Sequence, residues 1–158
     1  MGSLTSIYVF ACVFLSILWN NIQPTVENKI TANYSGHLLT EVPKNIPVHT
    51  HILDLSHNSI SEITNFRFTS LSDLQVLNLS HNLITELDFS AFMFNQDLEY
   101  LDLSHNNIWT AYCQLLARLR HLDLSFNKFT VLPICQEFGI MFHLEYLGLS
   151  AMMIRRSD

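Results

Sequence analysis

The chain repeats one pattern of leucine and asparagine at a nearly fixed spacing. Four segments align without gaps and fit L-x-x-L-x-L-x-x-N-x-L, except that Thr50 fills the first position of the earliest copy. A fifth keeps the apolar positions but has Met152 in place of the asparagine. The steps between successive asparagines and Met152 are 24, 24, 21 and 25 residues, which is typical of leucine-rich repeats. The five segments are residues 50–60, 74–84, 98–108, 119–129 and 144–154.

The L-x-L alternation places the leucines of each short strand on one face. One turn cannot bury that face alone, so successive turns must stack their strands into a parallel sheet over a shared core. We therefore predict an α/β solenoid: a leucine-rich-repeat arc of about five repeats, with a parallel sheet on the concave side and irregular or short helical segments on the convex side. The expected units are a signal peptide (1–22), an N-terminal cap (23–49), four repeats (50–73, 74–97, 98–118, 119–143) and an incomplete fifth (144–158).

The repeated asparagines are predicted to be structural. They stand where the chain leaves each strand, and backbone groups that turn inward there need hydrogen-bond partners. An amide side chain can both donate and accept, so a ladder of asparagines is expected along the solenoid. Its members are Asn58, Asn82, Asn106 and Asn127.

The N-terminus predicts export. Residues 7–19 are apolar apart from Ser16, which suits the core of a signal peptide and is too short for a membrane span. Residues 1–6 hold no Lys or Arg and also fit a loose myristoylation pattern, which would instead make the chain cytosolic and lipid-anchored. No second apolar run of spanning length follows, so we expect a secreted chain without a membrane span.

The two cysteines of the exported part lie at similar places in adjacent repeats. Cys113 comes seven residues after Asn106, and Cys135 comes eight after Asn127. The repeat geometry therefore predicts neighbouring side chains, and a disulfide between them in an oxidising compartment would contribute about 3 kcal/mol. Two free buried thiols are the alternative.

The outward strand positions form two expected columns on the concave face, one rich in Asp and Asn and one of serines (Ser56, Ser80, Ser104, Ser125 and Ser150). Small polar repeats usually mean a solvated face, although acidic character favours a cationic partner. Tyr100, His121 and Tyr146 form the aromatic-rich strip of this face, and we expect any local contact there.

Three histidines, His57, His81 and His105, precede the ladder asparagines and should lie about 5 Å apart on successive turns. Such a row of histidines could bind a metal or respond to acid, but a shared repeat consensus explains the same pattern. We expect no metal and no cofactor.

Two N-x-S sequons are candidate glycosylation sites, at Asn33 and Asn78. Asn33 is expected to be the better acceptor because it should lie outside the packed repeats. A glycan on Asn78 would lie on the concave face.

Several functional classes are disfavoured. The formal net charge is -6, and the eight Lys and Arg are scattered, so nucleic acid is not an expected partner. The sequence has no nucleophile elbow, phosphate loop, C-x-x-C or H-E-x-x-H motif, so we expect a protein that is not an enzyme.

The stretch at 132–139 reads L-P-I-C-x-E-x-G, and this stretch and the cysteine spacing are specific features, whereas L-x-L-S-x-N is shared by many repeat proteins. In these features the chain closely resembles the start of the ectodomain of the Toll-like receptors, in the subfamily of receptors 1, 6 and 10. The likeness runs from about residue 38 to the last residue, and it also covers 95–106 and 119–127.

The resemblance implies a cell-surface innate immune receptor that pairs with Toll-like receptor 2, senses microbial lipopeptides and signals through a TIR domain. It implies that this chain is only the opening part, without the lipopeptide pocket, membrane span or TIR domain. Cys113 and Cys135 match the family's disulfide between neighbouring repeats. The alternatives are a secreted binding protein of matrix type and a short decoy form.

Overall fold

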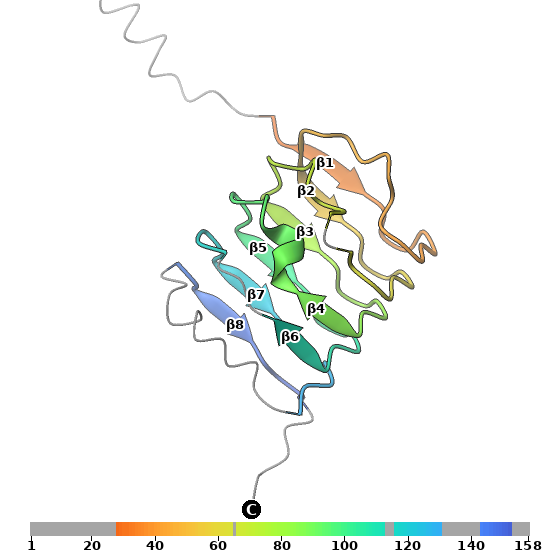
Figure 1. Cartoon of the computed structure of the whole chain (residues 1–158), viewed down its shortest axis with the longest axis vertical. Coiled ribbons are helices and arrows are strands. Elements are labelled where there is room, and N and C mark those ends of the chain that lie inside the picture. Colours follow the sequence, from red (N-terminus) through yellow and green to blue (C-terminus); the bar gives the residue numbers. More distant parts are fainter. Residues whose placement is uncertain (1–27, 65, 113–115, 131–142, 153–158) are drawn as a thin grey trace, which may run out of the picture.

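The computed structural model describes residues 28–64, 66–112, 116–130 and 143–152. They form a leucine-rich-repeat arc whose main element is a six-stranded parallel sheet, in the order β1-β2-β3-β5-β7-β8 (Figure 1). Each inner strand pairs with its counterpart one turn earlier and one turn later, and β1 and β8 form the two edges of the described sheet. The strands are β1 (Ile30–Asn33), β2 (Thr50–Asp54), β3 (Val76–Asn78), β5 (Tyr100–Asp102), β7 (His121–Asp123) and β8 (Tyr146–Gly148).

The remaining regular structure is short and lies in the return half of the turns. A second parallel pair joins β4 (Glu86–Asp88) to β6 (Thr110–Tyr112), and a single 3-10 turn, η1, spans Phe89–Phe92. Asp88 caps η1, because its carboxylate accepts the Ser90 N–H at 2.8 Å. The convex side therefore matches the expected irregular or short helical segments.

The register of the sheet places one leucine of every repeat directly beside the next. Leu53 pairs with Leu77, Leu77 with Leu101, and Leu101 with Leu122, and all four side chains are fully buried. The second leucine of each L-x-L pair is buried as well, at Leu55, Leu79, Leu103 and Leu124. Burial of each such side chain stabilises the fold by roughly 1.5–3 kcal/mol, so the core is a continuous leucine column.

The back of the core is made by the apolar positions that recur five and ten residues after each asparagine. Ile63 and Leu87 are buried, and so are Phe68 and Phe92, whose ring centroids are 5.5 Å apart. Leu132, the expected counterpart in the fourth repeat, lies outside the described residues. The same holds for Cys113 and Cys135, so their disulfide stays a prediction.

The segment before the first repeat is part of the sheet. β1 pairs in parallel with β2, and Asn33 stands opposite Asp54. From the sequence we expected Asn33 to lie outside the packed repeats. This expectation was wrong, because Asn33 is part of the sheet. It occupies the same strand position as Asp54 and Asn78.

The serine column also differs from expectation. Ser56, Ser80, Ser104 and Ser125 are buried, with exposed fractions of 4% to 8%, and only Ser150 is exposed. These serines follow the last residue of each strand, where the chain already bends into the turn. The concave face is thus formed by the two outward positions within each strand.

Across the ranges that the structure describes, no helix is long and apolar enough to cross a lipid bilayer.

Candidate functional site

The ladder asparagines join adjacent turns through every polar atom of their amides. The Nδ2 of Asn82 donates to the carbonyls of Leu55 (3.0 Å), Leu79 (3.1 Å) and Ser80 (3.2 Å). Its Oδ1 accepts the Ile60 N–H at 3.0 Å. One buried side chain therefore satisfies four backbone groups that the bend leaves without partners.

The other ladder members repeat this arrangement. Asn58, Asn106 and Asn127 each donate to the preceding turn and to their own bend. Their Oδ1 atoms accept the N–H groups of Leu39, Ile84 and Ile108 at 2.9 to 3.0 Å. All are nearly inaccessible to solvent, so these amides hold the scaffold together and leave no group for a ligand.

A second column, which we call the Asx column, runs along the concave face at the last position of each strand. In each described case the side-chain Oδ1 accepts the backbone N–H of the serine two residues later, at 2.8 to 2.9 Å. Such a turn fixes the side chain and leaves its second polar atom, Nδ2 or Oδ2, for solvent. The members are Asn33, Asp54, Asn78, Asp102 and Asp123.

The fifth repeat departs from this column because it has a glycine. A Cβ added at Gly148 would lie 2.2 Å from Oδ1 of Asp123 and 2.9 Å from Oγ of Ser125. The N–H of Ser150 instead donates to that Ser125 hydroxyl at 3.2 Å. The space of the missing side chain is thus already taken by the fourth repeat.

Beside the Asx column lies a stack of three aromatic rings, which we call the concave stack. The centroids of Tyr100 and His121 are 4.2 Å apart, as are those of His121 and Tyr146, and the ring planes are within 10° and 7° of parallel. The three residues hold the same position in neighbouring strands. The parallel sheet spacing therefore forces the rings into contact, face to face, with their edges toward solvent.

The concave stack has an acidic neighbourhood. The pKa of the Tyr100 phenol is raised, first by burial and then by the charges of Asp102 and Asp123 and the neighbouring Tyr146. Towards the N-terminus the same strand position is held by Ile52 and Val76. The two outward columns of the described sheet contain no Lys or Arg, so this face is apolar and aromatic along one line and acidic along the next.

A second stack, the rim stack, lies where the chain leaves the strands. His57, His81 and His105 are stacked at centroid distances of 4.3 and 4.2 Å, which confirms the alignment expected from the sequence. All three have positive φ of 53° to 54°, which is sterically unfavourable for such residues. The pKa of His81 is lowered, first by burial and then by the charges of His105 and His57, with Asp102 acting in the opposite direction.

Neither of two small surface cavities adds a binding site. One, of about 230 Å³, is lined by Glu99, Arg118, Arg120 and His143. Arg118 is paired with Asp97 there. The guanidinium of Arg120, which also lines this cavity, lies 3.5 Å from the carboxylate of Glu145.

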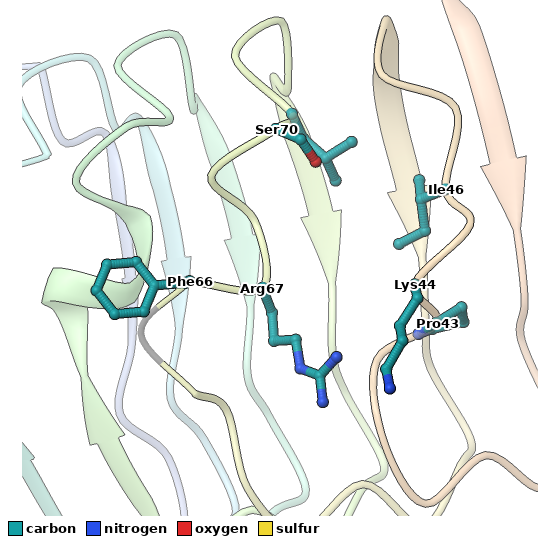
Figure 2. Close-up of a pocket in the computed structure, with 7 residues that line it drawn as sticks. Pro43, Lys44, Ile46, Phe66, Arg67 and Ser70 are labelled. Carbon is teal, nitrogen blue, oxygen red and sulfur yellow. The ribbon is translucent and has the colours of Figure 1, made fainter.

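The other cavity, of about 190 Å³, lies between the cap and the first repeat (Figure 2). Arg67 reaches it but already binds Glu41 at 2.8 Å. Phe66, which also lines this cavity, is largely exposed, so the cavity is open to solvent on that side. Within the described residues, no three His, Cys, Asp or Glu side chains converge as metal ligands.

Sequence reasoning missed the first member of the Asx column. The segment Asn33-Tyr34-Ser35-Gly36 occupies the positions of Asp54-Leu55-Ser56-His57 in the first repeat. Gly36 has a positive φ of 68°, and the residues at the same place in later repeats also have positive φ, of 52° to 57°. The pattern N-x-S-G was the available signal, but the leucines and the ladder asparagine that mark the other repeats are absent.

Comparisons with known proteins agree with this architecture. Models of the leucine-rich-repeat family match residues 49–108 and 118–138, together about half of the chain. Among solved structures, a leucine-rich-repeat protein of Leptospira interrogans superimposes with a TM-score of 0.65 and 31% identity, covering 75% of this chain and 30% of that one.

Curated relatives are similar over almost all of this chain. Human Toll-like receptor 1 is 47% identical over 98% of it, human Toll-like receptor 6 is 52% identical over 94%, and bovine Toll-like receptor 10 is 45% identical over 100%. The matched part is 19% to 20% of each relative. The chain therefore spans about a fifth of the length of these receptors.

Proposed function

Because the chain belongs to the leucine-rich-repeat family and is similar over nearly its whole length to about a fifth of Toll-like receptors 1, 6 and 10, we propose that it serves as the N-terminal recognition scaffold of such a receptor. The observation that carries this proposal is the identity of 45% to 52% over nearly the whole chain. In this role the chain is not an enzyme. It is exported and displayed outside the cell.

The proposed receptor senses microbial lipopeptides together with a Toll-like receptor 2 type co-receptor and starts inflammatory signalling. These activities belong to a receptor about five times longer than this chain. What this segment supplies is rigidity, because its buried asparagine amides fix each turn to the next. A rigid first segment holds the rest of the ectodomain in a defined orientation.

The concave stack is the proposed contact surface within this segment. Tyr146 is 46% exposed, and Tyr100 and His121 are half-buried, so the ring edges are accessible. Tyr and stacked aromatic rings are frequent anchors in protein interfaces because they bury a large area with little loss of conformational freedom. The adjacent Asp102 and Asp123 favour a cationic group on the partner.

A chimeric receptor tests the proposed function. The matching N-terminal segment of full-length human Toll-like receptor 6 is replaced by this chain, and the chimera is expressed with Toll-like receptor 2 in cells that carry an inflammatory reporter. We expect surface display and a lipopeptide response within about threefold of the parent, since the fold is shared. A chimera displayed at the normal level that gives no response contradicts the proposal, whereas poor display reports a folding defect.

An added glycan tests the contact surface separately. The substitution Asp123→Asn turns residues 123–125 into an N-x-S sequon beside the concave stack and preserves the Asx turn. Asp54→Asn makes the same change in the same column, three strands nearer the N-terminus, and is the matched control. We expect occupied Asp123→Asn to reduce the response at least tenfold and Asp54→Asn to leave it unchanged. Equal responses from both glycosylated variants reject the contact.

A secreted leucine-rich-repeat binding or decoy protein is the alternative function. It predicts that the chain alone, added to cells, lowers the lipopeptide response of the unmodified receptors. Dose-dependent inhibition, together with a silent chimera, would favour that function.

A further inference from the structure

The two sequon asparagines lie in one column of the concave face. Asn33 on β1 and Asn78 on β3 both pair with Asp54 on β2, so their Cα atoms are two strand spacings, about 10 Å, apart. Asn33 is exposed and Asn78 is half-buried. Two groups attached at these positions would stand side by side on the first three strands.

The Asx turn leaves Nδ2, the atom to which a glycan would be attached, free in both residues. Oδ1 of Asn33 accepts the Ser35 N–H, and Oδ1 of Asn78 accepts the Ser80 N–H, both at 2.9 Å. Within the described part of the chain, neither Nδ2 has a hydrogen-bond partner. The turn that the repeat requires therefore uses one amide atom and directs the other toward solvent.

The repeat pattern itself generates the sequon. Each member of the Asx column is followed two residues later by a serine, so an Asn at this position completes N-x-S where an Asp does not. Asp54, Asp102 and Asp123 make the same turn without a possible acceptor nitrogen. Asp is thus a natural substitute that keeps the turn and removes the acceptor.

We propose that Asn33 and Asn78 both carry N-linked glycans, and that these glycans cover the concave face of β1 to β3 and the adjacent β5, and leave the far end of the concave stack, on β7 and β8, open. In the transfer, Nδ2 loses one proton and bonds to the anomeric carbon of the first sugar, and the pyrophosphate of the lipid-linked oligosaccharide donor leaves. The Asx turns remain because Oδ1 takes no part in that bond. The glycosylated strands and the bare strands then divide the face into a shielded part and a contact part.

The shielding reaches the apolar residues next to the column. Ile52 lies on β2 between the two glycosylated strands, and its side chain is half-buried at an outward strand position. A glycan is large compared with the strand spacing, so it covers a neighbour at this distance. Tyr146, on the last strand of the sheet, lies five strands from Asn33 and three strands from Asn78, whereas Ile52 lies one strand from each.

Site occupancy is tested on the full chain expressed in mammalian cells, with peptide mapping of both the secreted and the intracellular pools before and after N-glycosidase treatment. We expect enzymatic conversion of Asn to Asp at both positions. Asn33→Asp and Asn78→Asp should each remove one glycan and leave secretion within about twofold. An unmodified Asn33 or Asn78 peptide in both pools overturns the two-site proposal, and because glycans are added before folding, a poorly secreted chain is still informative.

Hydroxyl-radical footprinting tests the shielding. We expect the labelling of Ile52 to rise at least threefold in the double variant Asn33→Asp/Asn78→Asp, while the labelling of Tyr146 stays constant. Equal labelling of Ile52 in the glycosylated chain and in the double variant contradicts the division of the face. Neither readout depends on receptor signalling, so this proposal can fail while the proposed function stands.

Discussion

The ring of His105 stacks on the ring of Phe126, with centroids 4.2 Å apart and planes within 9° of parallel. The two residues hold the same place in successive repeats, and both have positive φ, 53° and 57°. A phenyl ring therefore continues, without a charge, the stack that three imidazoles begin. Phe126 therefore shows that the fold accepts an uncharged ring at this position of the repeat.

Acid should destabilise the rim stack. The pKa of His81 is lowered by burial and by its two histidine neighbours, so the folded state binds a proton less readily than the unfolded state. The stability contributed by neutral His81 is then complete above the unfolded pKa of about 6.5 and is lost as the pH falls through the lower folded value. We expect the free energy of unfolding, measured with urea, to decrease from pH 7.5 to pH 5.

The substitution His81→Phe provides the matched test. It keeps a ring at this place, as Phe126 does, and removes the titrating group between His57 and His105. The decrease in stability on acidification should be smaller than in the parent. An unchanged pH dependence would show that His81 does not carry the effect.

Asn106 and its neighbour Asn107 should respond very differently to removal. Asn106 is 5% exposed, and its amide binds the carbonyls of Leu79 and Leu103 and the N–H of Ile84. Asn106→Ala leaves these groups unsatisfied and should lower the free energy of unfolding by about 3 kcal/mol. Asn107→Ala, on the half-exposed adjacent residue, should change it by less than about 0.5 kcal/mol. Urea denaturation of both variants gives the comparison, and equal effects would rule out the ladder as the cause.

Two glycines should tolerate alanine to different degrees. At Gly148 a Cβ would meet the Asp123 carboxylate, which is fixed by its hydrogen bond to the Ser125 N–H. Gly148→Ala should therefore cost about 1–3 kcal/mol through the displaced turn. At Gly36 no atom lies within 4 Å of the new Cβ, and only the positive φ opposes it. Gly36→Ala should cost about 1 kcal/mol, and thermal unfolding of the two variants checks the order.

The phenol of Tyr100 should ionise above the ordinary tyrosine range, because burial and the nearby carboxylates disfavour its anion. Removal of the covering ring by His121→Ala should lower that pKa toward the ordinary value. His121→Phe keeps a ring in the stack and should preserve most of the shift. Carbon NMR titration of the labelled tyrosines, with Tyr100→Phe for assignment, measures both, and a shift that survives His121→Ala would place its origin elsewhere.

The repeated part of this fold can be predicted from the sequence, because the consensus places the same residue types at the same positions of every turn. Leu77 and Leu101, for example, are 24 residues apart and lie side by side, as the period requires. The residues expected on the concave face, Tyr100, His121 and Tyr146, are adjacent because the same consensus fixes their register.

The sequence is less informative where the consensus fails. In β1, Ala32 and Tyr34 replace the two strand leucines and His37 replaces the ladder asparagine, so the pairing of this segment with β2 is set by tertiary contacts that no period shows. The burial of Ser56 could not be predicted from the sequence for another reason. Strand alternation assigns it to the outer face, but the chain bends before reaching it, so the period of two no longer applies.

The asparagine ladder determines which changes of length this chain can accept most easily. Asn82 reaches back to Leu55 and Asn106 reaches back to Leu79, in both cases 27 residues earlier, and each carries the same set of bonds. A duplicated unit of 24 residues would receive these bonds from its predecessor and offer them to its successor without any change of sequence. Whole-unit duplication is therefore the length change that costs this architecture least, whereas the gain or loss of a few residues must be absorbed in the return segments.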